Sequence, residues 1–399
     1  MSLKYAERMD NIKASEIREL LKLTQDPKVI SFAGGLPAAE LFPIEEMKKI
    51  SVDVLEKYGK VALQYGPTEG YEPLRKVIAS RMKKLGVEAS KDNILVISGS
   101  QQGLDFSGKI FINPGDVILC ESPSYLGAIN AFKAYEPKFI EVPTDGDGMI
   151  LEDLEDILKN NDNVKFIYVI PDFQNPSGRT WTEERRKGLI ELANKYDIVI
   201  VEDNPYGELR FEGEYLPALA HYDTEGRVIF LGTFSKIFCP GLRLGWVYAR
   251  SDILNKFILT KQGADLQSST ISQIQVAEFF EGYDIDGHIE KLRTVYKKRK
   301  DVMIKAMEDE FPDCVSFTRP NGGLFTWAVL PENINARELA VKALKKNVAF
   351  VPGGSFFPNG GNENTMRLNY SCMNEEKIIE GIKRLAAAIN DMLLETEKA

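Results

Sequence analysis

The sequence predicts an α/β protein with a mostly parallel sheet, and two observations support this prediction. Between Ile94 and Gly232, short apolar runs alternate with longer segments of helical periodicity. The chain also has 399 residues, which exceeds one typical core, and 44% of them are hydrophobic. Alternation of this kind implies right-handed crossovers between parallel strands, with helices on both faces of the sheet.

Each predicted element follows from its own pattern. Residues 12–23 and 44–58 have helical spacing, and a Gly/Pro-rich loop then leads to a helix that ends near Leu85. Six strands are expected at ILVIS, VILCE, KFIEV, KFIYVI, DIVIVE and VIFLG, and a further apolar run follows Gly245. The helices between them are expected at SQQGLDFSGKIF, SYLGAINAFKAY, LEDLEDILK and TEERRKGLIELANKY.

The chain after Gly245 has a different organisation. It is mainly helical, with a long helix expected over residues 288–311, and it ends in a smaller αβ region. Helices over 336–345 and from Glu375 onward flank the strands VAFV and MRLNYS. We therefore expect a large domain over residues 49–290 and a small domain over 291–399, with the N-terminal segment 1–48 joined to the small one.

Composition excludes several function classes. The net charge of −9, with 59 acidic against 50 basic residues, argues against nucleic acid as the main partner. The basic run KKRK, residues 297–300, is interpreted as a solvated helix face. No apolar run is long enough for a membrane span, and the start MSLKYAERMD does not resemble a signal peptide. These patterns favour a cytoplasmic protein.

The scarce metal-ligating residues limit the chemistry further. The four cysteines form no CxxC pair, and two precede or lie in apolar runs, so buried free thiols in a reducing cytoplasm are expected. The two histidines, His221 and His288, exclude a multi-histidine zinc site, and no metal is expected. A Ser-His-Asp triad would have to use one of these two. A lysine with a lowered pKa is the natural candidate for proton transfer.

Polar residues follow the ends of the predicted strands. A parallel sheet binds its ligands at this edge, so these residues are candidates for one site. They are Ser100 and Gln101 after ILVIS, Tyr125 after VILCE, Asn175 after KFIYVI, Asp203 and Tyr206 after DIVIVE, and Thr233, Ser235, Lys236 and Arg243 after VIFLG. Taken singly, each has an ordinary alternative: a capped helix start, a tight turn, an exposed loop aspartate or a solvated lysine. Asp203 follows an apolar strand, where a buried carboxylate needs a cationic partner.

One ligand would use all of these groups together, namely a phosphorylated aromatic heterocycle that carries an aldehyde. The start of the helix at Ser100 suits the phosphate, as do Ser235 and Arg243. Tyr125 suits the ring, Asp203 a protonated ring nitrogen, and Lys236 the aldehyde. Asn175 and Tyr206 suit a ring hydroxyl. These requirements are those of pyridoxal phosphate.

Seven segments in order resemble the fold-type-I pyridoxal-phosphate aminotransferases of class I/II, and within them the 2-aminoadipate/kynurenine aminotransferase group. The segments are SFAGGLPAAELFP, QYGPTEGYEPLR, SGSQQGLD, PDFQNPSG, EDNPYGEL, TFSKIFCPGLRLGW and RPNGGLFTW. The resemblance covers essentially the whole chain. It implies a large domain with a mostly parallel seven-stranded sheet between helices, and a smaller α/β domain.

The resemblance also implies roles for individual residues. Lys236 would form the Schiff base with the cofactor, and Asp203 would pair with its ring nitrogen. Asn175 and Tyr206 would bond the ring oxygen, and Tyr125 would stack on the ring. The phosphate would be held by Ser100, Gln101, Thr233, Ser235 and Arg243, and by Tyr65 from a neighbouring subunit of a homodimer. Many relatives have serine at the position of Thr233, and the hydroxyl is retained.

For the substrate, the resemblance implies that Arg367 and Asn175 bind the α-carboxylate end and that Gly35 lies in a segment covering the site. Arg18 matches an arginine that meets the distal carboxylate of acidic substrates; its ordinary alternative is a solvated pair with Glu16 or Glu19. The implied reaction transfers an amino group from an L-amino acid of the 2-aminoadipate, glutamate, leucine or aromatic type to a 2-oxo acid such as 2-oxoglutarate.

Three other functions remain open from the sequence. A β-lyase or a decarboxylase would use the same cofactor and scaffold. A transcriptional regulator would carry this fold as a sensor behind a winged-helix domain, whereas only about thirty residues precede SFAGG here. A non-catalytic cofactor carrier would give no reason for Lys236 and Arg367 to occur together.

Overall fold

A seven-stranded sheet organises most of the computed structural model, which describes residues 3–10, 12 and 26–396. The strand order is β2-β8-β7-β6-β5-β3-β4, and β8 alone runs antiparallel to its neighbours. The strands are β2 (Ile94–Ile97), β3 (Val117–Ser122), β4 (Lys138–Pro143), β5 (Val164–Val169), β6 (Val199–Asn204), β7 (Val228–Thr233) and β8 (Gly245–Tyr248). This arrangement confirms the predicted mostly parallel sheet.

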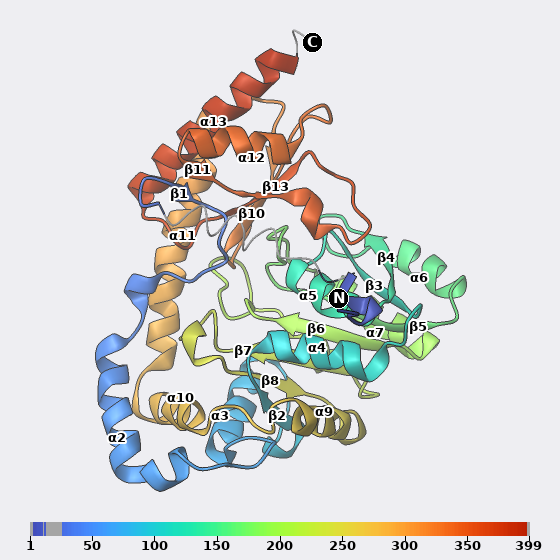
Figure 1. Ribbon diagram of the computed structural model, residues 1–399, viewed down its shortest axis with the longest axis vertical. Coiled ribbons are helices and arrows are strands. Elements are labelled where there is room, and N and C mark those ends of the chain that lie inside the picture. Colours follow the sequence, from blue (N-terminus) through green and yellow to red (C-terminus); the bar gives the residue numbers. More distant parts are fainter. Residues whose placement is uncertain (1–2, 11, 13–25, 397–399) are drawn as a thin grey trace.

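Helices cover this sheet because its central strands are apolar on both faces. Figure 1 shows the sheet in the lower half of the molecule, with α4 lying across it in front and α2 at the outer edge. The helices of this part are α2 (Ile44–Ala62), α3 (Glu72–Met82), α4 (Ser100–Phe111), α5 (Leu126–Lys133), α6 (Leu151–Lys159), α7 (Glu183–Tyr196), α8 (Leu219–Tyr222), α9 (Ser251–Ala264) and α10 (Thr270–Gly282).

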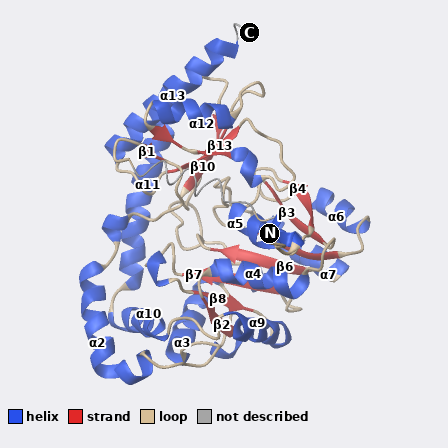
Figure 2. Cartoon of the chain, viewed as in Figure 1, coloured by secondary structure: helices blue, strands red, loops and turns tan. Residues whose placement is uncertain are grey.

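A smaller αβ layer forms the upper half of the molecule (Figure 2). Its antiparallel sheet has the order β12-β13-β10-β9, with β9 (Ser316–Phe317), β10 (Phe325–Val329), β12 (Val351–Pro352) and β13 (Thr365–Asn369). The N-terminal strand β1 (Ile30–Ser31) pairs in parallel with β11 (Val348–Ala349). Helices α12 (Ala336–Lys345) and α13 (Glu375–Thr396) pack on this layer. The N-terminal segment is thereby joined to the C-terminal part of the chain.

Helix α11 (Ile285–Glu310) connects the two hydrophobic cores. Its first half contributes Ile289 and Leu292 to the core around the large sheet. Its second half contributes Met303 and Met307 to the core of the small layer. The domain limits expected from the sequence stay a prediction.

The interpretation of KKRK as a solvated face is wrong for two of its four residues. Arg299 and Lys300 are 6% and 7% exposed. Arg299 forms an ion pair with Glu40 and donates to the carbonyl of Ser371, while Lys300 pairs with Glu212. The burial could not be predicted from the run of charges, because successive residues of a helix point to different sides.

Most other elements agree with their sequence patterns. The helix expected at SYLGAINAFKAY begins later, at Leu126, because Tyr125 has an extended backbone. The pattern over residues 12–23 lies outside the described residues except for residue 12.

Short 3₁₀ turns are η1 (Glu7–Asp10), η2 (Ala39–Leu41), η3 (Lys83–Leu85), η4 (Lys91–Asn93), η5 (Pro240–Leu242) and η6 (Gly353–Phe356). The four cysteines are free, but the expected burial holds only for Cys120: Cys239 and Cys372 are half-buried and Cys314 is exposed. Among the described helices, none combines the length and apolarity that a bilayer crossing needs.

Candidate active site

A cavity of about 380 Å³ opens where the strands of the large sheet end and the small layer begins. Strands β5, β6 and β7 are parallel, so the segments that follow them meet at one edge of the sheet. The small layer closes the cavity with Phe325 of β10 and Arg367 of β13. The sequence-predicted residues that line it are Gly35, Ser100, Gln101, Tyr125, Asn175, Asp203, Tyr206, Thr233, Ser235, Lys236, Arg243 and Arg367.

Lys236 reaches the cavity from the turn that follows β7. Its Nζ donates a hydrogen bond to the carbonyl of Gly35 at 2.8 Å, which connects the lysine to the N-terminal segment. Burial, followed by the nearby charge of Arg367, lowers the pKa of Lys236 to about 8. More of Lys236 is therefore neutral at physiological pH than of an exposed lysine, and a neutral amine can act as a nucleophile or a base.

Asp203 lies at the end of β6 and is 2% exposed. Its Oδ2 accepts a hydrogen bond from the hydroxyl of Tyr168 at 3.0 Å. Its Oδ1 has no hydrogen-bond partner among the residues that the structure describes. Burial raises the pKa of Asp203 to about 7, because a carboxylate loses its hydration there.

Asp203 was expected to have a cationic partner, but it forms no ion pair with any described residue. The nearby charge of Lys236 lowers the pKa of Asp203, although Nζ of Lys236 donates its hydrogen bond to the carbonyl of Gly35 and not to the carboxylate. A buried carboxylate with one free oxygen at a cavity is suited to a ligand that brings its own N–H donor. The protonated ring nitrogen of a heterocycle is such a donor.

Arg367 and Asn175 form the opposite side of the cavity. Arg367 is 2% exposed; its Nη1 donates to Oδ1 of Asn175 at 2.8 Å and its Nη2 to the carbonyl of Ala33 at 2.7 Å. Asn175 in turn donates to the hydroxyl of Tyr206 at 3.4 Å. The rings of Phe325 and Phe356 lie 4.2 and 5.1 Å from the guanidinium carbon.

Arg367 keeps free binding capacity despite these contacts. Its Nε has no hydrogen-bond partner in the described part of the chain. Burial lowers the pKa of Arg367 to about 10, which leaves the side chain charged at neutral pH. A buried guanidinium with an unused N–H at a cavity wall suits a carboxylate ligand.

The remaining predicted residues gather around the start of α4. This helix begins at Ser100, and the free N–H groups of its first turn favour an anion. Gly99 precedes it with φ +81°, and a β-carbon there would lie 2.5 Å from Nη2 of Arg243. Glycine is therefore required for the close approach of the arginine. The hydroxyl of Thr233 bonds Ser235 at 2.9 Å, which shapes the turn that faces this helix end.

These features together fit pyridoxal phosphate. The free Oδ1 of Asp203 suits the ring nitrogen, Lys236 the aldehyde, and the helix start with Arg243 the phosphate. The three groups approach the same cavity from different elements, so one molecule can meet all of them.

One predicted residue among those described does not line this cavity. Tyr65 is 79% exposed on the surface, in the loop after α2. Arg18 lies outside the described residues. Their roles stay predictions.

Sequence reasoning missed several residues that shape the site. Phe325 packs edge-on against Tyr206 with ring centroids 5.9 Å apart, and Leu36 and Ile170 also line the cavity. Tyr168 lies behind the cavity, beneath Asp203. A signal for Tyr168 existed, because a phenol within the apolar run KFIYVI needs a buried polar partner.

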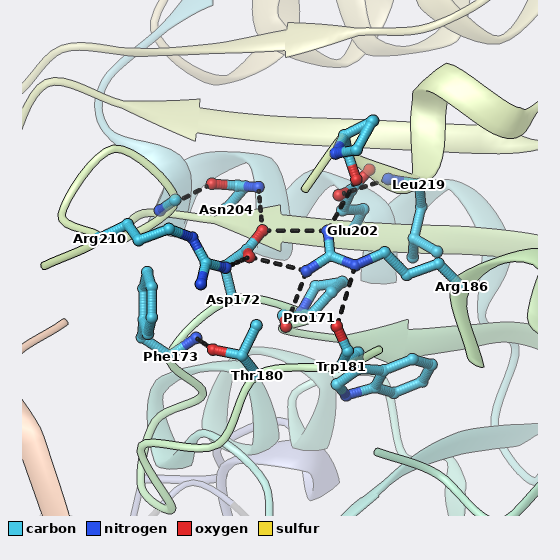
Figure 3. A network of polar contacts seen from close by, with 12 residues as sticks. Pro171, Asp172, Phe173, Thr180, Trp181, Arg186, Glu202, Asn204, Arg210 and Leu219 are labelled. Carbon is cyan, nitrogen blue, oxygen red and sulfur yellow. Dashed lines mark hydrogen bonds and ion pairs between the residues drawn. The ribbon is translucent and has the colours of Figure 1, made fainter. Parts of the chain in front are cut away.

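A buried ion network supports the strand ends that carry the site (Figure 3). Asp172, three residues before Asn175, lies between Arg186 of α7 and Arg210. Arg186 contacts both carboxylate oxygens, at 2.7 and 3.2 Å, and also donates to the carbonyls of Pro171, Trp181 and Pro217. Asn204, the neighbour of Asp203, donates to Asp172 at 3.3 Å. The network thus fixes the ends of β5 and β6 relative to one another.

The sequence and the structure are similar to those of known aminotransferases. The family model for aminotransferase class I and II matches residues 27–385. An aromatic-amino-acid aminotransferase of Thermococcus litoralis is 50% identical over 392 residues, which are 97% of this chain and 94% of the relative. The solved kynurenine aminotransferase of Pyrococcus horikoshii, in complex with PMP, has a TM-score of 0.93 and 45% identity, and the match covers 98% and 97% of the two chains.

A second solved structure carries a cofactor derivative. The α-aminoadipate aminotransferase LysN of Thermus thermophilus is complexed with N-(5'-phosphopyridoxyl)-L-leucine. Its TM-score is 0.92 at 42% identity, and the match covers 98% of each chain.

Proposed function

The chain belongs to the class I and II aminotransferase family, whose members depend on pyridoxal phosphate, and from this premise we propose its substrates and the roles of its residues. The enzyme transfers an amino group between an L-amino acid and a 2-oxo acid. We propose that the amino donors are 2-aminoadipate, glutamate, leucine and aromatic amino acids and that 2-oxoglutarate is the acceptor. The names of the similar chains, which include aromatic, kynurenine and α-aminoadipate aminotransferases, support this range.

One observation carries the residue assignments. Lys236, Asp203 and Arg367 all line one cavity. Among the described residues, neither Oδ1 of Asp203 nor Nε of Arg367 has a hydrogen-bond partner. A base, an acceptor for a ring N–H and an anchor for a carboxylate are what transamination of an amino acid requires.

The proposed cofactor contacts follow from the cavity walls. Tyr125 would contact the ring, and Asp203 would accept a hydrogen bond from the ring nitrogen. Asn175 and Tyr206 would bond the ring hydroxyl. The start of α4 would hold the phosphate, together with the cavity residues Ser100, Gln101, Thr233, Ser235 and Arg243. Pyridoxal phosphate, when bound, supplies an aldehyde for the amino group and a ring that delocalises the electrons left after the α-proton departs.

Lys236 has two proposed tasks, which its surroundings allow. With pyridoxal phosphate bound, the Nζ of Lys236 would hold the aldehyde of the cofactor. The same amine, once free, would accept the α-proton of the substrate and hold it for return. The lowered pKa of Lys236, about 8, keeps enough neutral amine for the first proton transfer.

Arg367 is the proposed anchor for the α-carboxylate of the substrate, together with Asn175. It is held by Asn175 and by the carbonyl of Ala33, so the guanidinium is oriented before the substrate arrives. Gly35 lies two residues after Ala33 in the segment proposed to cover the site, and its carbonyl accepts a hydrogen bond from Lys236. Arg18 is proposed to meet the distal carboxylate of acidic substrates.

The proposed assembly is a cytoplasmic homodimer with composite sites. Tyr65 is highly exposed in one copy, which suits a side chain that reaches the phosphate of a neighbouring copy. Around it, α2 and the following loop expose Val61 and Leu63. Exposed apolar side chains in adjacent positions suit a surface that another copy covers. We also propose that the large domain spans residues 49–290, between the N-terminal segment and the small domain.

A substrate panel tests the proposed specificity. The purified protein, supplied with pyridoxal phosphate, would be assayed with 2-aminoadipate and each standard amino acid except glutamate, with 2-oxoglutarate as the acceptor. Glutamate would be assayed with a different 2-oxo acid, since its reaction with 2-oxoglutarate gives no net change. Acidic and large apolar or aromatic donors should give the highest kcat/KM values. High activity with aspartate or alanine alone would contradict the proposed range, while the membership in the family would stand.

A further inference from the structure

The hydroxyl of Tyr168 lies directly behind the carboxylate that faces the cavity. Tyr168 belongs to β5 and is 1% exposed, and its hydroxyl donates to Oδ2 of Asp203 at 3.0 Å. The side chain is not part of the cavity wall. Its hydrogen bond to Asp203 is its direct contact with a residue that lines the cavity.

The two oxygens of Asp203 have different environments. Oδ2 is bound by Tyr168, and Oδ1 has no partner within the described residues. We propose that Tyr168 is a positioning residue, whose hydroxyl holds Oδ2 so that Oδ1 remains the acceptor for the protonated ring nitrogen of the cofactor. The proposal rests on the role assigned to Asp203.

Two physical effects favour this assignment. The terminal torsion of an aspartate is broad, so a single fixed donor to one oxygen sets the rotation of the carboxylate and thereby the position of the other oxygen. A hydrogen bond to the ionised carboxylate also stabilises the charged form. A carboxylate that stays ionised leaves the proton on the ring nitrogen, where it is needed to accept electrons.

Packing keeps the tyrosine in place without its hydroxyl. The ring of Phe132 lies edge-on to Tyr168, with centroids 5.6 Å apart. Tyr168 also pairs across the sheet with Cys120 of β3 and Val201 of β6. Phenylalanine at position 168 preserves these contacts and removes only the donor, so Tyr168→Phe is expected to fold.

The test is a double-mutant cycle with Tyr168→Phe and Asp203→Asn. Affinity of the cofactor-free protein for pyridoxal 5'-phosphate would be measured by fluorescence titration, and kcat and KM by steady-state transamination. Tyr168→Phe should lower both cofactor affinity and kcat. The product of the two losses should be on the order of ten- to a hundredfold, and KM for the amino acid should not change. In the Asp203→Asn background the same change should have an effect below about twofold.

Tyr135→Phe is the matched control. Its hydroxyl also donates to a carboxylate, Oδ1 of Asp105, at 2.9 Å, but neither residue lines the cavity. This variant should keep the wild-type affinity and kcat. If Tyr135→Phe causes the same losses as Tyr168→Phe, the effect is a general one of removing a tyrosine hydroxyl that binds a carboxylate, and the proposal is wrong.

The remaining outcomes distinguish a failure of the role proposed for Tyr168 from a failure of the role proposed for Asp203. Equal losses from Tyr168→Phe in both backgrounds would show a structural role and overturn the proposal. Wild-type behaviour of Tyr168→Phe beside a damaged Asp203→Asn would overturn the proposal alone. Wild-type behaviour of Asp203→Asn would remove the role of Asp203 itself. Should Tyr168→Phe fail to fold, a site-specific fluorotyrosine, which is a stronger donor, should raise cofactor affinity; no change or a decrease would count against the proposal.

Discussion

Asp203 combines a buried position with a charge that its role demands. In the cofactor-free protein, burial raises its pKa from 3.8 to about 7. Between about pH 4 and pH 7, Asp203 is therefore mostly protonated in the folded state and mostly ionised in the unfolded state. Folding stability falls as the pH rises through this window, because the ionised carboxylate is destabilised by burial. A protonated ring nitrogen would relieve this destabilisation when the cofactor binds.

Asp203→Asn should consequently stabilise the cofactor-free protein at neutral pH. At about pH 8 the free energy of unfolding should exceed that of the wild type by a few kcal/mol, which is the order that about three pKa units imply. Near pH 4 the two proteins should unfold alike. Chemical denaturation across this range measures the difference. A variant that is less stable than wild type at both ends would show that the carboxylate is required for folding.

Arg18 is the residue on which the acidic-substrate assignment depends. A hydrogen bond between charged groups is worth roughly 1.5–3 kcal/mol. Arg18→Ala should therefore lower kcat/KM for 2-aminoadipate and glutamate by on the order of ten- to a hundredfold and leave leucine and aromatic donors nearly unchanged. Arg8→Ala, another N-terminal arginine, serves as the control. Equal losses on both substrate classes would mean that Arg18 only supports its own segment.

At the scale of elements, the Asp172 network fixes the strand ends that carry Asn175 and Asp203 (Figure 3). Arg186→Met removes the main partner of a buried carboxylate, so the free energy of unfolding should fall by about 3–5 kcal/mol. Arg319→Met is the matched control, since its ion pair with Glu308 is largely exposed and should contribute at most about 1 kcal/mol. Denaturant unfolding compares the two. Similar losses for both variants would contradict a special role for the buried pair.

Elements of the large sheet could be predicted because each has a regular local pattern. The helix SQQGLDFSGKIF begins and ends where its sequence indicated, at Ser100 and Phe111. Helix α5 could not be located as well, since the extended backbone of Tyr125 reflects its tertiary surroundings and not its propensity. The burial of Arg299 and Lys300 likewise depends on Glu40, Ser371 and Glu212, which are distant in sequence.

The site was predictable to the extent that strand ends converge. Parallel strands bring Asn175, Asp203 and Lys236 to one edge, so their meeting follows from the alternation alone. The approach of Arg367, and of Phe325 beside it, depends on how the small layer sits on the large sheet. No local pattern encodes that contact, and for Arg367 only the family resemblance supplied it.

For the whole molecule, the proposed dimer makes the exposed Tyr65 part of a neighbouring site. Lys236→Ala subunits and Tyr65→Ala subunits, each inactive or strongly impaired, should regain activity when mixed, because one of the two sites in a heterodimer has both residues intact. Activity after verified subunit exchange is the measurement. Absence of recovery would place Tyr65 in the site of its own subunit or outside any site.

The central claim is that Lys236, within the cavity between the two layers, carries out amino transfer. The most direct measurement follows ¹⁵N from a labelled amino acid into glutamate, with 2-oxoglutarate as the acceptor, in wild type and Lys236→Ala. The wild type should form labelled glutamate. Lys236→Ala should still bind pyridoxal phosphate yet transfer label slower by at least the factor of roughly 10²–10⁴ that an acid–base group contributes. Transfer by Lys236→Ala at a rate near that of the wild type would contradict the account.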